Sequence, residues 1–283
     1  MLEEILIISI ALIGLIIATI TDLKYREVPD YLNYFLIASG FSFRFFYSIL
    51  SNNWVYFLYG LLGFGVGFLI GLLLYFSKQW GGGDAKLLMG LGVIFATKPY
   101  FIQDNTNFLL KLILYIFLSG AVYGVFYGVY LAFKHKNKFS AEFKKILRGD
   151  KIKFLRIFSF FISLILFALF LNSNDLATKL ILLFFILFLL TYVYFWIFLK
   201  SIENICMFKI IPVSALEEGD WVIEDIIVNK KFLFNKNKLS VEKKDILRFM
   251  REGVKKVKIK VGIPFVPSFL IGTLLSLFLW KLF

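Results

Sequence analysis

The stretch Ile5–Asp22, with the sequence ILIISIALIGLIIATITD, carries no ionisable side chain before its last residue. As an α-helix it rises about 27 Å, which is close to the roughly 30 Å of hydrocarbon in a bilayer. Apolar runs of comparable length recur along the chain, and short polar stretches separate them. We therefore expect eight membrane-spanning helices. They lie at residues 4–21, 31–50, 54–76, 84–97, 107–133, 152–172, 176–200 and 264–282.

The composition agrees with a chain that resides mostly in lipid. Of 283 residues, 60% are hydrophobic and 18% are charged, whereas soluble domains average about 45–50% and about 25%. A soluble globular enzyme is excluded, because a water-facing surface needs more charge than this. The single cysteine excludes a disulfide framework or a Cys-rich zinc module. The single histidine, His135, argues against a Ser-His-Asp triad or a histidine-based metal site.

Residues 201–263 are the only stretch long and polar enough to form a small folded domain outside the membrane. Turn signals and alternating apolar residues predict strands near 208–213, 221–228 and 254–261, and a helix over 241–252. The expected fold class is an all-α polytopic membrane protein with a small cytoplasmic α+β insert. The expected domains are a membrane domain at 1–200, the insert at 201–263 and a C-terminal transmembrane helix at 264–283.

Glycines recur at every third or fourth residue of the third expected span. They are Gly60, Gly63, Gly67 and Gly71. This spacing places them on one helical face, where small residues let two helices approach closely in lipid. We interpret the series as a helix-packing face rather than as a ligand groove.

The net charge of +13 follows the expected topology. If both chain termini lie outside the cell, 27 of the 32 Lys and Arg residues fall in or beside the cytoplasmic loops 22–30, 77–83, 134–151 and 201–263. The exceptions are Arg44, Lys98, Lys111, Lys179 and Lys281. Because positive residues concentrate on the cytoplasmic side of membrane proteins, we interpret the basic excess as topology, with attraction to anionic membrane lipid second. Nucleic-acid binding is not expected, since neither basic loop carries a recognition motif.

Two aspartates stand at expected span ends on the same side of the membrane. Asp22 ends the first span, and Asp84 begins the fourth, directly after Gly81–Gly83. An ionisable residue in a membrane span is a functional hypothesis by default, because its burial in lipid is costly. Taken singly, Asp84 would cap a helix and Asp22 would pair with Lys24 or Arg26. Their arrival at one membrane face favours a catalytic pair.

The residues around this pair resemble a known family. Asp22 is followed by a basic residue and then by Val28-Pro29-Asp30, and the second motif is Gly81-Gly82-Gly83-Asp84-Ala85-Lys86-Leu87. Together they resemble the GxGD aspartic peptidases that process type IV prepilins, and among these they are most similar to the archaeal preflagellin and prepilin peptidases. The segment Gly262-Ile263-Pro264-Phe265-Val266-Pro267, which leads into the last span, is also similar to that family.

The resemblance implies an aspartic endopeptidase of the cell membrane that cleaves the short basic leader from archaellin or type IV pilin-like precursors. It assigns catalysis to Asp22 and Asp84, and it implies neither a metal nor an organic cofactor. It also places the active site at the cytoplasmic membrane face. Several acids are candidates to meet the basic leader, and the sequence does not choose among them. They are Glu27, Asp30, Glu217, Glu218 and Asp220.

The departures from related families are informative. Many bacterial members carry a zinc-binding loop with paired CxxC motifs and also N-methylate their product, but this chain has only Cys206, so the resemblance does not extend to either property. The presenilin-like intramembrane peptidases share GxGD, yet their first aspartate follows tyrosine and they carry a Pro-Ala-Leu motif. Here Thr21 precedes Asp22 and that tripeptide is absent, so this family ranks second. A proton-coupled transporter using Asp22 and Asp84 is the remaining alternative, and it predicts acids near the membrane midplane.

Overall fold

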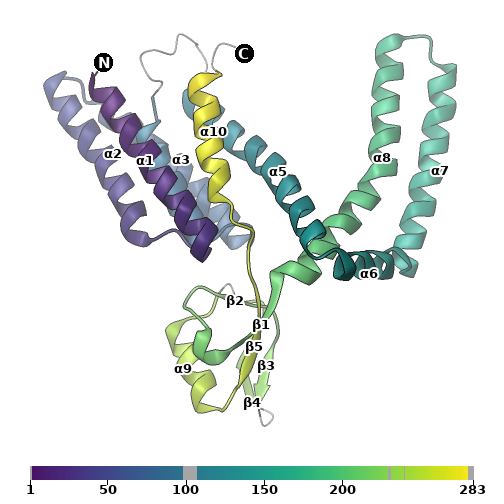
Figure 1. Ribbon diagram of the computed structural model, residues 1–283. Helices are drawn as coiled ribbons and strands as arrows, with labels where there is room; N and C mark the ends of the chain where they lie inside the picture. Colours follow the sequence, from purple (N-terminus) through teal and green to yellow (C-terminus); the bar gives the residue numbers. More distant parts are fainter. Residues whose placement is uncertain (1, 98–106, 229–230, 239, 280–283) are drawn as a thin grey trace. The chain divides into compact units, whose positions relative to one another are not determined.

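A computed structural model describes residues 2–97, 107–228, 231–238 and 240–279 of the chain (Figure 1). The chain forms two compact units, residues 1–126 with 211–283, and residues 127–210. Each unit is described by itself. These units are defined by contacts within the chain. The expected domains are defined by which segments lie in the membrane. The expected domain boundaries after residues 200 and 263 therefore stay a prediction.

The first unit contains the helices that carry both aspartates. They are α1 (Leu2–Tyr25), α2 (Asp30–Leu50), α3 (Val55–Phe76), α4 (Gly82–Ile94), the larger part of α5 (Phe108–Lys134) and α10 (Val266–Phe278). Helix α4 packs against α2 and α3, whereas α1 packs against α10, α2 and α4. All residues of α4 from Leu87 to Ile94 are buried. This short helix is therefore at the centre of the unit's hydrophobic core.

Close backbone contact holds α3 against α4 through the glycine face predicted from the sequence. A Cβ atom added at Gly63 would lie 2.1 Å from the carbonyl oxygen of Gly92. A Cβ atom added at Gly67 would lie 2.7 Å from the carbonyl oxygen of Leu88. Real Cβ atoms essentially never come this close to another atom, so only glycine fits. The interpretation of this series as a packing face is confirmed.

All eight expected spans are helical, and the structure confirms a helical polytopic membrane protein. Among the described residues, five helical stretches are long and apolar enough to cross a membrane. They are Glu4–Tyr25, Val55–Phe76, Phe108–Lys134, Asp150–Asn172 and Leu176–Met207. The other three are more polar or shorter, because α2 buries Arg44 and because α4 and α10 have 13 residues each, about 20 Å of helix. Residues 280–282 of the last expected span lie outside the described residues.

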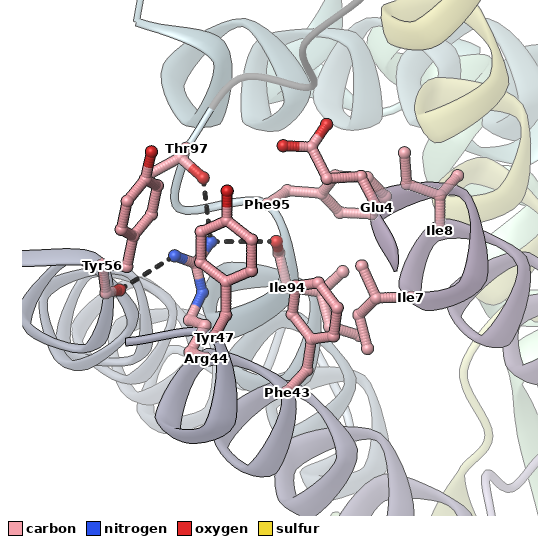
Figure 2. A pocket seen from close by; sticks show the side chains of 10 residues that line it. All are labelled: Glu4, Ile7, Ile8, Phe43, Arg44, Tyr47, Tyr56, Ile94, Phe95 and Thr97. Carbon is pink, nitrogen blue, oxygen red and sulfur yellow. Dashed lines mark hydrogen bonds between the residues drawn. The ribbon is translucent and has the colours of Figure 1, made fainter. Parts of the chain in front are cut away.

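Arg44 of α2 donates hydrogen bonds to carbonyl oxygens at the C-terminal end of α4 (Figure 2). It is one of the five cations outside the cytoplasmic group. Its side chain is only 5% exposed. Nε donates to the carbonyl oxygen of Val93 at 2.5 Å, and Nη2 donates to that of Ile94 at 3.1 Å. Nη1 donates to the carbonyl oxygen of Tyr56 at 3.0 Å. The last carbonyls of a helix have no partner within the helix, so this buried cation has a local structural function that the topology rule does not describe.

The second unit contains a helical hairpin and a short basic helix. Helices α7 (Asp150–Asn172) and α8 (Leu176–Ile202) run side by side (Figure 1), and α6 (Lys136–Leu147) packs against α8. A π-helix, η1 (Glu203–Met207), continues α8. Asn204 of this π-helix donates to Oε1 of Glu142 in α6 at 2.9 Å. Most large apolar side chains of α7 and α8 are exposed, as expected for helices whose neighbours are lipid tails.

The insert forms two small sheets and one helix. Its elements are β1 (Phe208–Pro212), the 3-10 turn η2 (Val213–Ala215), β2 (Trp221–Val222), β3 (Ile226–Val228), β4 (Lys231–Phe234), α9 (Lys243–Arg251) and β5 (Lys256–Lys260). One sheet has the strand order β1-β5-β2, and β3 pairs with β4 in the other. The predicted α+β character is confirmed, but the strand expected over 221–228 is divided between the two sheets. The hairpin strand β4 was not expected from the sequence.

Candidate active site

Asp22 lies in the last turn of α1 and is buried, with 5% of its surface exposed. The helix ends three residues later, at Tyr25, because Arg26 adopts a positive φ of 65° and its N–H donates to the carbonyl oxygen of Asp22. Oδ2 of Asp22 accepts a hydrogen bond from the backbone N–H of Val266 at 2.9 Å. Val266 is the first residue of α10, where a backbone N–H has no partner within its own helix. A donor from the far end of the chain therefore satisfies the buried carboxylate.

Asp84 lies in the first turn of α4, and its carboxylate turns back on the glycine run. Oδ2 accepts a hydrogen bond from the backbone N–H of Gly81 at 3.1 Å. Gly81 is the N-cap of α4 and Asp84 is the third residue after it, so the alternative in which Asp84 itself caps the helix is wrong. The side chain completes the cap from within the helix and leaves its second oxygen, Oδ1, to face other groups.

The glycine run fits against the start of α2. A Cβ atom added at Gly83 would lie 3.1 Å from Cβ of Val28 and 3.3 Å from its carbonyl oxygen. Asn33 of α2, which is completely buried, donates from Nδ2 to the carbonyl oxygen of Gly83 at 3.3 Å. Lys86 extends this contact with an ion pair to Asp30 at 2.7 Å. The turn before Asp84 is thus held by apolar, amide and ionic contacts from one short segment of α2 and the residues before it.

The structure brings the two aspartates together. Helix α1 packs against α4, and Asp22 and Asp84 are close enough for their charges to interact. Arg26 is also close enough to act on Asp22 through its charge, and an ion pair between the two stays a prediction. Lys24 instead lies 4.9 Å from the ring centre of Tyr25. The pairing that the topology predicted is present, together with one neighbouring cation.

The structure also groups some of the acids that were candidates to meet a basic leader. Glu27 follows the end of α1, and its carboxyl group is in hydrogen-bonding contact with that of Glu217 in the insert. Partial burial, followed by this contact, raises the pKa of Glu27, and Asp220 contributes in the same direction. Oδ2 of Asp220 accepts the N–H of Glu217 at 2.9 Å. Asp30, by contrast, is engaged by Lys86.

The described part of the chain contains no cluster of three or more His, Cys, Asp or Glu side chains that could hold a metal ion. Cys206 lies in the π-helix of the second unit. Asp22 and Asp84 offer two neighbouring carboxyl groups, and like charges at close range disfavour the ionisation of both.

Sequence reasoning missed three groups at this site. Asn33 carries no motif signal beyond being an amide in an apolar helix. The N–H of Val266 is a backbone group, which no side-chain pattern reveals, although the similarity of residues 262–267 to the family pointed to this region. Trp80 directly precedes the glycine run and is buried against α10, a contact that only the fold shows.

These features define the class: a helical membrane protein whose paired aspartates lie at adjoining helix ends. Residues 9–129, which include both aspartates, match the model of the type IV leader peptidase family. The match extends from α1 into α5.

Individual relatives agree with the family. The preflagellin peptidase of Methanococcus maripaludis strain C6 is 29% identical over 155 residues, which cover 51% of this chain and 67% of that protein. The preflagellin peptidase of Methanocaldococcus jannaschii is 40% identical over 82 residues, 29% of this chain and 35% of that protein. That of Methanococcus voltae is 28% identical over 155 residues, 51% of this chain and 66% of that protein. No solved structure matches the chain.

Proposed function

We propose that this protein is a membrane-embedded aspartic endopeptidase that cleaves the short basic leader from archaellin or type IV pilin-like precursors. The observation that carries the proposal is the electrostatic contact between Asp22 and Asp84 across α1 and α4. The match of residues 9–129 to a leader peptidase family supports hydrolysis of a peptide bond. The preflagellin peptidases among the relatives support archaellin precursors as the substrate class.

The hydrogen bonds at the two carboxylates support different roles for the two oxygen atoms of each carboxylate. In Asp22 and in Asp84, Oδ2 is occupied by a backbone N–H, from Val266 and from Gly81 respectively. The Oδ1 atoms are then the ones that share a proton and hold a water molecule between them. Because a backbone donor fixes each side chain, the pair is preorganised for a reaction that depends on geometry.

The reaction follows from one proton shared by the pair. The ionised carboxylate takes a proton from the water as the water oxygen bonds to the scissile carbonyl carbon. The protonated partner donates a hydrogen bond to the carbonyl oxygen as that oxygen becomes negative. When the C–N bond of the tetrahedral intermediate breaks, a carboxyl group supplies the proton to the leaving amine. The products are a new carboxylic acid and a new amine, which become a carboxylate and an ammonium group by proton transfer, and the pair returns to its starting state.

The distribution of charged residues supports two parts of the proposal, namely that the site lies at the cytoplasmic face and that acidic residues recognise the basic leader. The concentration of 27 of 32 Lys and Arg residues in and beside four loops favours a cytoplasmic position for those loops, with both termini and the opposite span ends outside. Asp22 and Asp84 then lie at the cytoplasmic face, where an uncleaved basic leader would be. Of the candidate acids, Glu27, Glu217 and Asp220 are grouped beside α1, and they complement such a leader.

The test is cleavage of a tagged preflagellin by membranes that contain the protein. Asp22→Asn and Asp84→Asn should each abolish cleavage, because Asn keeps the shape of Asp but cannot exchange the proton. Asp150→Asn, at the start of α7, is the matched control and should cleave at the wild-type rate. Equal membrane content of each variant is measured by its own tag. Near wild-type turnover by either Asp22→Asn or Asp84→Asn contradicts the aspartic mechanism.

A further inference from the structure

Trp80 directly precedes the glycine run that leads to Asp84. Its side chain is buried, with 4% exposed. Its ring centre is 5.3 Å from that of Phe265 and 5.1 Å from that of Phe269, at the start of α10. Its ring is also stacked on Phe117 of α5, with 5.7 Å between the centres and 15° between the planes. Three aromatic rings from two helices therefore fix the position of this indole.

The sequence neighbours of this aromatic contact are the two backbone donors of the site. Trp80 is bonded to Gly81, whose N–H donates to Oδ2 of Asp84 at 3.1 Å. Phe265 is bonded to Val266, whose N–H donates to Oδ2 of Asp22 at 2.9 Å. A single ring-to-ring contact thus connects the two peptide groups that hold the two carboxylates.

The ring of Phe265 packs closely against α5 and α10. A Cβ atom added at Gly120 of α5 would lie 2.4 Å from the ring of Phe265, so this ring already fills the space that the glycine leaves. Phe265 also meets Phe269 edge-on, at 5.8 Å and 89°. Ser119 of α5 donates from Oγ to the carbonyl oxygen of Ser268 at 2.8 Å. The start of α10 is therefore held against α5, and Trp80 is held against both.

We propose that the contact between Trp80 and Phe265 sets the distance and orientation of Asp22 relative to Asp84. Both aromatic residues are positioning residues, since they act through the N–H groups of Gly81 and Val266 and not on the substrate. The inference rests on the proposed function, because it concerns the geometry of the same pair. Reactions that need two groups in register lose about 100-fold in rate when a group moves by about 1 Å, so the loss of this contact should appear in turnover.

The first test separates turnover from binding and from folding. Trp80→Leu and Phe265→Leu should each lower kcat on tagged preflagellin by about 10- to 100-fold, with KM within about twofold of wild type, because the leader is bound elsewhere. Trp80→Phe keeps a ring in contact with Phe265 and should restore most of kcat. The matched control is Phe95→Leu, which removes a buried ring that packs on Phe108 with 5.7 Å between centres in the same unit. Its kcat per folded molecule should stay at the wild-type level.

A second measurement does not depend on activity. In hydrogen–deuterium exchange, the N–H groups of Gly81 and Val266 should be protected in the wild-type protein, because each donates to a carboxylate. Their exchange should become several-fold faster in Trp80→Leu and in Phe265→Leu, and it should not change in Phe95→Leu.

Two results would overturn the inference. The first is that Trp80→Leu and Phe265→Leu have the same kcat per folded molecule as the control Phe95→Leu. The other is exchange of the Gly81 and Val266 N–H groups that neither Trp80→Leu nor Phe265→Leu changes. If the wild-type protein cleaves no precursor, the proposed function fails, and the exchange rates still decide whether the aromatic contact holds the two donors in place.

Discussion

Nε of Arg44 donates to the carbonyl oxygen of Val93 at one end of the helix whose other end carries Asp84. Helix α4 thus has a glycine turn closed by a carboxylate at its N-terminal end and a buried guanidinium at its C-terminal end. Negative groups are favourable at the first and positive groups at the second, because of the helix dipole. Asp84 and the two carbonyl groups that Arg44 binds, those of Val93 and Ile94, therefore lie at opposite ends of one short helix, nine and ten residues apart.

We predict that Arg44→Met lowers the stability of the membrane domain. The variant removes the charge together with its donors and leaves the carbonyl oxygens of Val93, Ile94 and Tyr56 without this partner, at a cost of about 1–3 kcal/mol for each buried acceptor that finds no other. The measurement is thermal unfolding in detergent. Lys179→Met is the control, since it also removes a cation from an apolar helix, and it should leave the melting temperature near that of wild type. An equal shift in the two variants would show that loss of charge alone is responsible.

The glycine face of α3 offers a matched pair of substitutions. Gly63→Ala should lower the yield of folded protein and its melting temperature, because the new methyl group would lie 2.1 Å from the carbonyl oxygen of Gly92. Overpacking of this kind costs about 1–3 kcal/mol or more. Gly65→Ala, two residues away on another face, meets no atom within 4 Å and should be neutral. A Gly63→Ala protein as stable as Gly65→Ala would show that α3 and α4 are not packed as described.

The contact between Glu27 and Glu217 predicts a pH dependence of stability. Burial and then the neighbouring carboxyl raise the pKa of Glu27 above its ordinary value of 4.5. Protonation therefore favours the folded state: the contribution is complete below the unfolded pKa and is lost as the pH rises through the folded one. Glu27→Gln should be more stable than wild type at pH 7 and no more stable at pH 4. The difference is small and shrinks in high salt, because the carboxyl is largely solvent-exposed.

The control for Glu27→Gln is Glu218→Gln, which removes a neighbouring exposed acid of the insert. Melting temperatures of both variants are measured between pH 4 and pH 8. A pH profile for Glu27→Gln that is parallel to that of wild type would contradict the described contact between Glu27 and Glu217.

The topology makes a separate prediction. In a Cys206→Ser background, single cysteines at Asn137 and Asn237 should react with a membrane-impermeant thiol reagent only after the cells are permeabilised. A cysteine at Asn174, between α7 and α8, should react in intact cells. The reason is the concentration of Lys and Arg in the loops that contain the first two positions. Labelling of Asn237→Cys in intact cells would invert the topology and remove the aspartates from the side where an uncleaved leader is available.

The sequence allowed a good prediction of which segments are helical, because apolar runs and their polar ends are local features. It also predicted that Asp22 and Asp84 meet, since the direction of alternate spans places both at one face. The shortness of α4 and α10 was not predictable in the same way. Arg44 serves the end of α4 through contacts with residues about 50 positions away, and hydropathy does not report such contacts.

The insert shows a second reason why the sequence-based expectation and the structure differ. Residues 221–228 read as one strand because their apolar content is continuous, yet Trp221–Val222 pairs with β5 and Ile226–Val228 pairs with β4. Strand pairing is decided by partners distant in the chain, so a continuous pattern can serve two sheets. The same holds for the active site, where the donor to Asp22 is a backbone N–H with no signature in the sequence.

The hydrogen bond between Asp22 and Val266 has a consequence for the timing of biogenesis. The two residues are 244 positions apart, and at about 5–20 residues per second a ribosome needs roughly 12 to 50 s to travel from one to the other. During that interval α1, α2 and α4 can already be in the membrane while the carboxylate of Asp22 still lacks its backbone donor. A nascent chain therefore carries both aspartates but only one of the two donors that hold them. The candidate site has both of its backbone donors only after the last helix has been synthesised.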